Sequence, residues 1–175
     1  YVMGKNYPLA FYTYGIVYGN DMRNSEFMVT GTTYDWAVFC GIGDVNADGT
    51  DDFSLGYKYF VGDSRYSKVI LYYGTSTEEY SDSLVICEGL NFGPFTYPAG
   101  DVNRDGHPDF ISSFSGTAKL YFGGTGFDGT QFVEISPPYS GGNWHNGLCF
   151  GDVNNNGTDD LIGTNVSQFD GYGDA

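Results

Sequence analysis

Residues 43–52 read GDVNADGTDD, and almost the same ten residues return as GDVNRDGHPD at 100–109 and as GDVNNNGTDD at 151–160. Counted from its first aspartate, each copy places oxygen-bearing side chains at positions 1, 3, 5 and 9 and a glycine at position 6. Ca²⁺ is a hard cation that takes about six to eight oxygen ligands, and alternate residues of a tightly turning loop direct their side chains toward one centre. Glycine at position 6 permits the sharp turn that a Cβ would resist. The repeat therefore predicts three calcium loops.

These loops differ from those of an EF-hand. An EF-hand closes its site with a glutamate at position 12, where this chain has Leu55, Ser112 and Gly163. Asp, Asn and Gly are also ordinary turn residues, so three similar turns that never bind metal are the alternative interpretation. That alternative is strongest for the third copy, in which Asn156 replaces the carboxylate at position 5. Three copies in one chain favour calcium.

The composition indicates a folded, strand-rich, acidic protein. Of 175 residues, 41% are hydrophobic, 18% are aromatic and 27 are glycine, which suits many short strands joined by tight turns. No stretch is apolar over about 18 residues, so we expect no membrane span. The formal net charge of −15, from 22 acidic and 7 basic residues, argues against nucleic-acid and anionic-membrane partners.

The spacing of the loops predicts a repeated unit of four strands. The first loop aspartates, Asp44, Asp101 and Asp152, are 57 and 51 residues apart, a period typical of propeller blades or repeat arrays. Four β-type segments recur in each period, and the third ends in two aromatic residues and a glycine, YYG at 72–74 and YFG at 121–123. Because helical periodicity is absent, the expected fold is all-β, with four-stranded antiparallel blades of the β-propeller type.

The chain divides into two whole blades and two partial ones. We expect a partial β-propeller over 1–175, composed of a partial blade at 1–33, blades at 34–89 and 90–142, and a partial blade at 143–175. Closed propellers need about four to eight blades. The stretch is therefore expected either to be an excerpt of a longer chain or to assemble head to tail through its incomplete blades.

The expected strands of the first partial blade are its second, third and fourth, at 7–14, 15–19 and 26–29. The last partial blade is expected to end near 169–171, after a first strand, a loop and a second strand.

The motif GDVN-x-DG-x-x-D followed by an apolar strand, with Phe92-Gly93 ahead of the second copy, resembles the FG-GAP (VCBS-like) repeats of integrin α-subunit β-propellers and of many secreted bacterial proteins. The resemblance extends from about residue 34 to the end and, more faintly, over 7–33, although the Gly-Ala-Pro tripeptide is absent. It implies a propeller in which the calcium loop joins the first and second strands of each blade.

The resemblance also implies calcium ligands at loop positions 1, 3, 5, 7 and 9, with position 7 supplying a backbone carbonyl. In this chain those positions are Asp44, Asn46, Asp48, Thr50 and Asp52, then Asp101, Asn103, Asp105, His107 and Asp109, then Asp152, Asn154, Asn156, Thr158 and Asp160. We therefore expect three Ca²⁺ ions as cofactors. The first two loops, with three carboxylates each, should bind more tightly than the third, which has two.

No catalytic constellation is evident, so we expect a binding module rather than an enzyme. The close carboxylate pairs lie inside the loops, His107 occupies a loop position, and no G-x-S-x-G motif is present. A catalytic His145, or a propeller that serves as scaffold or accessory module of a polysaccharide lyase or hydrolase, is the alternative. A second alternative is a lectin, whose sugar-binding surface would use exposed Trp36, Tyr97 and Trp144.

The remaining sequence features bear on whether the protein is located inside or outside the cell. Cys40, Cys87 and Cys149 form no zinc pattern; buried free thiols are expected, with a Cys40–Cys149 bridge as the alternative. Asn165 lies in an Asn-Val-Ser sequon and is a candidate for glycosylation. Weakly charged EF-like loops hold Ca²⁺ at about 10⁻⁴–10⁻³ M in extracellular modules. We expect a secreted or cell-surface module, stabilised by calcium, that binds a protein or carbohydrate ligand, adheres or assembles.

Overall fold

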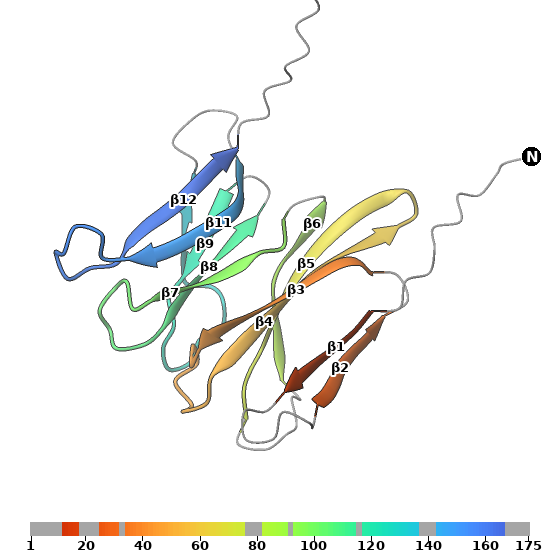
Figure 1. The fold of residues 1–175 in the computed structure, drawn as a ribbon. Coiled ribbons are helices and arrows are strands. Elements are labelled where there is room, and N and C mark those ends of the chain that lie inside the picture. The colour runs from red at the N-terminus through yellow and green to blue at the C-terminus, as the bar shows by residue number, and fades with distance from the viewer. Residues whose placement is uncertain are drawn as a thin grey trace, which may run out of the picture.

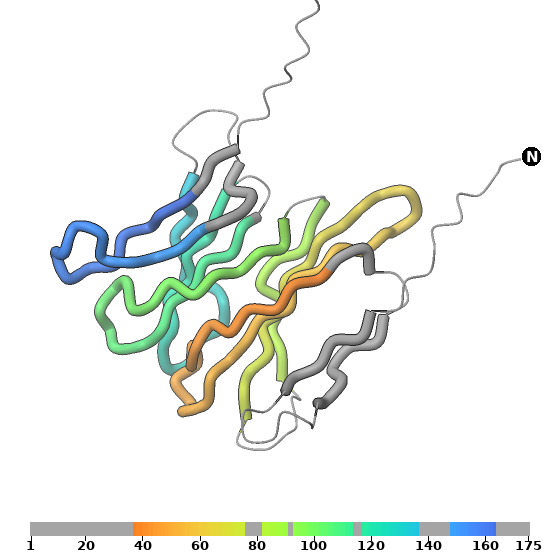
Figure 2. The backbone as a smooth tube through the Cα atoms, in the orientation of Figure 1, coloured from red at the N-terminus to blue at the C-terminus, as the bar shows by residue number. Residues whose placement is uncertain are grey.

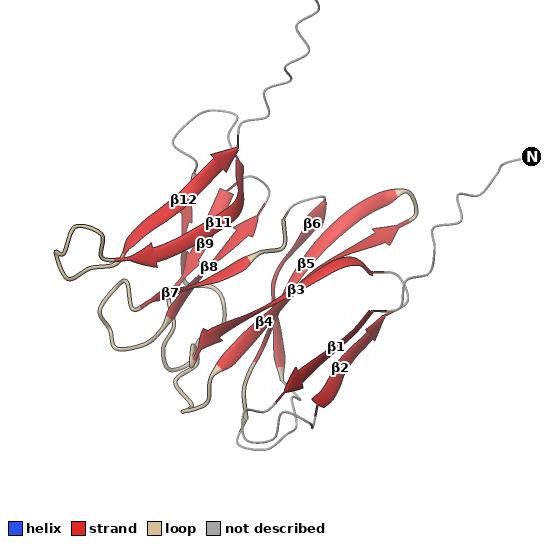
Figure 3. Ribbon diagram, viewed as in Figure 1, coloured by secondary structure: helices blue, strands red, loops and turns tan. Residues whose placement is uncertain are grey.

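The computed structural model describes residues 12–17, 25–31, 34–75, 82–90, 93–114, 117–136 and 143–166, and within these ranges the chain forms twelve strands and no helix (Figures 1 and 3). One four-stranded sheet contains β3 (Tyr34–Gly43), β4 (Asp52–Val61), β5 (Ser64–Tyr72) and β6 (Ser83–Leu90). A second contains β7 (Thr96–Gly100), β8 (Asp109–Phe114), β9 (Thr117–Tyr121) and β10 (Phe132–Ile135). Two pairs complete the set, β1 (Tyr12–Val17) with β2 (Ser25–Gly31), and β11 (Asn143–Gly151) with β12 (Asp160–Val166).

Each sheet is an antiparallel meander, because strands that follow one another in the chain are hydrogen-bonded neighbours in space. The all-β class and the four-stranded antiparallel sheets predicted from the repeat are thereby confirmed. The ten-residue repeat falls between the first and second strands of each sheet, and in the same way between β11 and β12. In the described part of the chain the sheets form an open array rather than a closed ring (Figure 1).

The alternation of side chains along each strand gives the β7–β10 sheet two apolar faces. Phe110 and Tyr121 lie on one face and pack with Ile42, Val45 and Leu71 of the β3–β6 repeat. Their chain neighbours point to the opposite face, since the side-chain period of a strand is two. There Ala99, Ile111, Ala118 and Leu120 pack with Leu148 of β11. The core of the molecule therefore lies between sheets rather than inside a single sheet.

The first strands of successive repeats approach one another, β3 with β7 and β7 with β11. This arrangement gathers the three ten-residue repeats along one side of the molecule (Figure 2). The loops are close neighbours: a Cβ on Gly43 would lie 3.0 Å from the Pro108 ring, and one on Gly100 would lie 2.8 Å from Asp159 Oδ2. The fold thus places three similar loops in a row.

At the start of the chain the strands differ from those expected. β1 covers 12–17 as one strand, so it joins the end of the expected second segment to the start of the third, with a register shift between Tyr14 and Gly15. Residues 7–11, 18 and 19 and the expected end at 169–171 lie outside the described residues. No helix in the described ranges is long and apolar enough to cross a membrane.

Candidate metal centre

Position 1 organises each loop by accepting two backbone hydrogen bonds. The N–H of position 5 donates to Oδ1 of Asp44, Asp101 and Asp152 at 2.9, 3.0 and 2.9 Å. The N–H of position 6 donates to Oδ2 of the same residues at 2.8, 2.8 and 2.7 Å. The three loops therefore share one local geometry, determined by the aspartate with which each begins.

Positions 3 and 5 join this cluster. Asn46 Oδ1 accepts from the N–H of Asp48 at 3.0 Å, the same donor that Asp44 uses, so the oxygens of positions 1 and 3 lie side by side. The Asn46 amide donates to Asp48 Oδ2 at 2.8 Å, and the N–H of Thr50 donates to Asp48 Oδ1 at 2.9 Å. The second loop repeats all of these contacts. The structure thus brings together the side-chain oxygens of positions 1, 3 and 5.

The backbone of the loop needs two left-handed residues, of which the sequence signalled only one. The glycines at position 6 have φ values of 94°, 92° and 81°. Position 4 is also left-handed, with φ of 61° at Ala47, 62° at Arg104 and 57° at Asn155. Asparagine tolerates this region, whereas alanine and arginine are strained there by about 1–2 kcal/mol.

In the first two loops the position-9 aspartate is buried. Asp52 and Asp109 have exposed fractions of 1% and 0%. The N–H of position 2, on Val45 or Val102, donates to their Oδ2 at 2.9 Å in both loops. Their Oδ1 accepts from a glycine N–H at the end of the third strand, Gly74 at 2.8 Å and Gly123 at 2.9 Å. In the first two loops the position-9 carboxylate therefore connects the loop to the end of the third strand of the same sheet.

These contacts give the aromatic–glycine ending of the third strand a physical reason. A Cβ on Gly74 would lie 2.2 Å from the carbonyl oxygen of Asp51, and one on Gly123 would lie 2.2 Å from that of Pro108. Only glycine lets the strand approach the loop closely enough for its N–H to reach the buried carboxylate.

The electrostatics around position 9 favour a cation. Burial raises the pKa of Asp52 to about 6, with the amides of Gly74 and Val45 opposing the rise and the carboxylates of Asp48 and Asp44 adding to it. Burial likewise raises the pKa of Asp109. A bound divalent cation would relieve the repulsion among these carboxylates.

The donor set suits Ca²⁺, which accepts carboxylate, amide and backbone carbonyl oxygens. In the described ranges no three His, Cys, Asp or Glu side chains are grouped as a metal cluster of those residues would require. A cation in these loops would therefore depend on the asparagine at position 3 and on the carbonyl at position 7, the latter from Thr50, His107 or Thr158. The ligand assignment stays a prediction.

The third loop differs at position 9. Asp160 accepts from the N–H of Val153 at 3.2 Å and from the Asn154 amide at 3.3 Å, and it is half-buried. Its two hydrogen bonds are therefore longer than those of Asp52 and Asp109, and both come from within its own loop.

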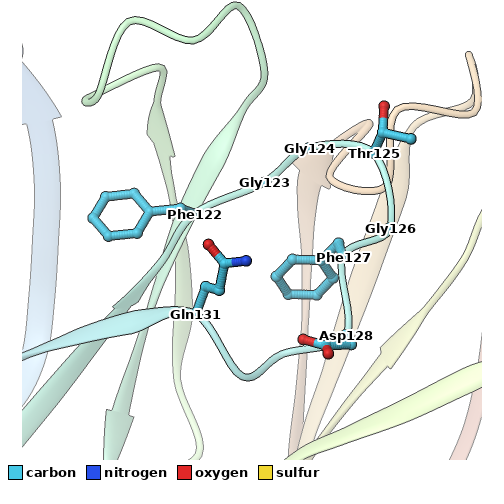
Figure 4. A pocket seen from close by; sticks show the side chains of 8 residues that line it. All are labelled: Phe122, Gly123, Gly124, Thr125, Gly126, Phe127, Asp128 and Gln131. Atoms are coloured by element: carbon cyan, nitrogen blue, oxygen red, sulfur yellow. The ribbon is translucent and has the colours of Figure 1, made fainter.

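A second feature is a pocket of about 160 Å³ in the connection between β9 and β10 (Figure 4). The Gln131 side chain lies between the rings of Phe122 and Phe127, with Asp128 beyond them. Asp128 Oδ1 accepts from the N–H and the hydroxyl of Thr130 at 2.9 and 2.6 Å, and these bonds hold the pKa of Asp128 below its usual range. The pocket is lined by two aromatic rings, an amide and a carboxylate.

The other candidates from the sequence separate into three groups. Tyr97, expected to be exposed, is half-buried against the cluster of Ile111 and Leu120, because the β11–β12 pair covers that face. The side chains of Trp36, Trp144, His145 and Asn165 lie outside the described residues. All three cysteines are free, with Cys87 buried, Cys40 half-buried and Cys149 exposed, so no Cys40–Cys149 bridge is present.

Comparison with protein-family models gives a match in the second half of the chain. A family model described as FG-GAP-like repeat matches residues 101–163, from the first aspartate of the second loop to just beyond the third. No curated protein and no solved structure matches the chain. The match confirms the resemblance that the GDVN loops suggested.

Proposed function

We propose that this chain, which carries FG-GAP-like repeat sequence over 101–163, is a calcium-stabilised module of β-propeller type from a secreted or cell-surface protein. The observation that supports it best is the convergence of positions 1, 3 and 5 in three loops of the same geometry, set in a row along one side of the molecule. Its task would be adhesion, ligand binding or structural assembly.

In this proposal calcium has a structural role. The ion would bind the oxygens of positions 1 to 9 and so connect the end of the first strand to the start of the second in each blade. Bound Ca²⁺ would supply positive charge to a loop rich in carboxylates. An extracellular location agrees with loops of this kind, which need about 10⁻⁴–10⁻³ M calcium.

Calcium binding can be tested by thermal unfolding with and without chelator. Metal that binds only the folded state stabilises it by mass action, so EGTA should lower Tm and added Ca²⁺ should restore it. Mg²⁺ at the same concentration is the control, because it requires a smaller and more regular octahedral site. Identical melting curves in EGTA and in millimolar Ca²⁺ would contradict the proposal.

We further propose that the sheets are blades, whole at 34–89 and 90–142 and partial at 1–33 and 143–175. Partial blades would be completed by further blades of a longer chain, or by a second copy in a head-to-tail assembly. Size-exclusion chromatography with light scattering on residues 1–175 in Ca²⁺ tests this. A well-folded monomer of 19.1 kDa would contradict both versions.

A carbohydrate ligand is the second candidate function, favoured by the pocket beside Phe122 and Phe127. Aromatic rings pack on the apolar faces of sugars, while an amide and a carboxylate bind their hydroxyls. The pocket is smaller than the about 300–1,000 Å³ of typical ligand sites, so it suits at most one sugar unit. Binding on a glycan array, lost in Gln131→Ala and retained in the surface variant Asp63→Asn, would support it.

We propose no catalytic activity for the chain itself, whose role in a polysaccharide lyase or hydrolase would be that of a scaffold or accessory module. Assays against polysaccharides and esters, repeated with His145→Ala, test this. Turnover that depends on His145 would overturn it.

A further inference from the structure

The third loop differs from the first two at position 5, where Asn156 stands in place of Asp48 and Asp105. Asn156 is followed by Gly157. In an Asn-Gly pair the backbone nitrogen of glycine attacks the side-chain carbonyl carbon of asparagine most readily, because glycine has no Cβ to shield that nitrogen. The same pair occurs at Asn146-Gly147 in β11, which provides a comparison within the chain.

Two hydrogen bonds prepare Asn156 for such an attack. The N–H of Gly157, whose nitrogen would be the nucleophile, donates to Asp152 Oδ2 at 2.7 Å. The N–H of Thr158 donates to Asn156 Oδ1, the oxygen of the carbonyl under attack, at 2.8 Å. A base thus contacts the nucleophile, and a donor contacts the oxygen on which negative charge develops.

Access for the reaction is also available. Asn156 and Gly157 are both exposed, so water reaches the site. Gly157 has a φ of 81°, and a Cβ placed there would lie 3.4 Å from Arg104 Nη2. Arg104 donates to the Gly157 carbonyl and to the Thr158 hydroxyl, which holds this part of the loop in place.

We propose that Asn156 deamidates in the folded protein, promoted by its own loop. The Gly157 nitrogen attacks Cγ of Asn156 and gives up its proton to Asp152, the Cγ–Nδ2 bond breaks, and the nitrogen leaves as ammonia with that proton. Water then opens the resulting five-membered imide, giving aspartate or isoaspartate at 156. The net reaction is amide plus water to carboxylate plus ammonium, and it needs no other reactant.

The aspartate product gives the third loop the ligand set of the first two. Its carboxylates at positions 1, 5 and 9 would then match those of the loops at 44–52 and 101–109, and calcium affinity rises with ligand charge. This consequence rests on the proposed calcium function, whereas the deamidation itself does not. The aspartate fraction of the product would therefore strengthen the third site, whereas the isoaspartate fraction, which adds a methylene group to the backbone, would not restore the ligand at position 5.

Peptide mapping by mass spectrometry tests the reaction on the full chain incubated in EGTA at neutral pH. We expect Asn156 to convert roughly tenfold or more faster in the folded protein than in urea, because the base and the oxyanion donor contact it only in the folded loop. Conversion of Asn146 in urea gives the reference rate of an Asn-Gly pair without loop structure. Equal rates for Asn156 in the folded protein and in urea would overturn the proposal.

Asp152→Asn removes the base, and Asp159→Asn makes the same charge change at a position that is not a predicted ligand. Conversion of Asn156 should slow severalfold in the first variant and stay unchanged in the second; equal slowing in both would overturn the proposed role of Asp152. Asn156→Asp should bind Ca²⁺ severalfold more tightly at the third site, measured by calorimetry against Asn156→Gln. Deamidation as described without any Ca²⁺ binding would support the reaction and contradict the proposed calcium function.

Discussion

All three ten-residue loops form the same turn. The loops at 44–52 and 101–109 differ from the loop at 152–160 in the hydrogen bonds of the position-9 aspartate. All three use the position-1 aspartate to hold the N–H groups of positions 5 and 6. Among the described residues, only the first two extend this order into the sheet, through a buried position-9 carboxylate that accepts from a glycine just after the third strand. In the described part of the third repeat, Asp160 bonds within its own loop.

This difference shows which hydrogen bonds depend on the loop sequence alone and which depend on the packing of the loop against the sheet. The turn forms wherever Asp-x-Asn-x-(Asp/Asn)-Gly is written, because its hydrogen bonds span at most five residues. The position-9 bonds to Gly74 and Gly123 span 22 and 14 residues and form only when a third strand lies beside the loop. The loop motif thus specifies a turn, and the sheet converts it into a rigid connection.

The largest expected effect is the loss of a buried position-9 carboxylate. Asp109→Ala leaves the N–H groups of Val102 and Gly123 without their partner, and each such group costs about 1–3 kcal/mol when buried. We expect the free energy of unfolding to fall by about 3 kcal/mol in EGTA. Asp160→Ala, with longer bonds and more exposure, should lose less than about 1 kcal/mol. Urea denaturation measures both, and equal losses would remove the distinction between the loops.

The second-largest loss of stability is expected at Gly123, where the loop backbone lies directly against the end of the third strand. Gly123→Ala places a methyl group 2.2 Å from the Pro108 carbonyl oxygen, so strand and loop must separate. We expect a loss of about 1–3 kcal/mol, the usual range for an overpacked core. Gly41→Ala in β3 is the matched control, since a Cβ there meets nothing within 4 Å. If both variants unfold at the same urea concentration, the close approach is not needed.

Much of this architecture could be predicted from the sequence. The threefold GDVN repeat located the three ten-residue loops, and the four β-type segments between them predicted the four-stranded antiparallel sheet. Both could be predicted because turn residues and strand periodicity are local signals. The left-handed position 4 was missed, since Ala47 and Arg104 are residues that do not usually mark such a backbone. The partnership of Asp52 with Gly74 was missed as well. It depends on a distance in space that the YYG ending suggests only once the sheet is known.

Position 4 provides a smaller test of the shared turn. Ala47→Gly removes left-handed strain and should stabilise the protein by about 0.5–1 kcal/mol, the strain relief being offset in part by glycine entropy. Arg104→Gly should stabilise it less or not at all, because Arg104 also bonds Gly157 and Thr158 of the third loop. Thermal unfolding compares the two variants. An equal gain in both would mean that the contact from Arg104 to the third loop contributes nothing to stability.

The smallest effect is a difference in thiol reactivity that leaves stability unchanged. Burial raises the pKa of Cys87 to about 11, with Ser112 of the neighbouring sheet 3.7 Å away, and burial also raises the pKa of Cys40. Cys149, which precedes the third loop, is exposed. A thiol reagent at pH 8 should therefore label Cys149 quickly, Cys40 slowly and Cys87 only after unfolding, because the thiolate is the reactive form and access to it is required. Cys149→Ser should abolish the fast phase alone. A fast phase that survives in Cys149→Ser would show that the first repeat opens as readily as the third, and the contrast between the loops would then not extend to the strands that carry them.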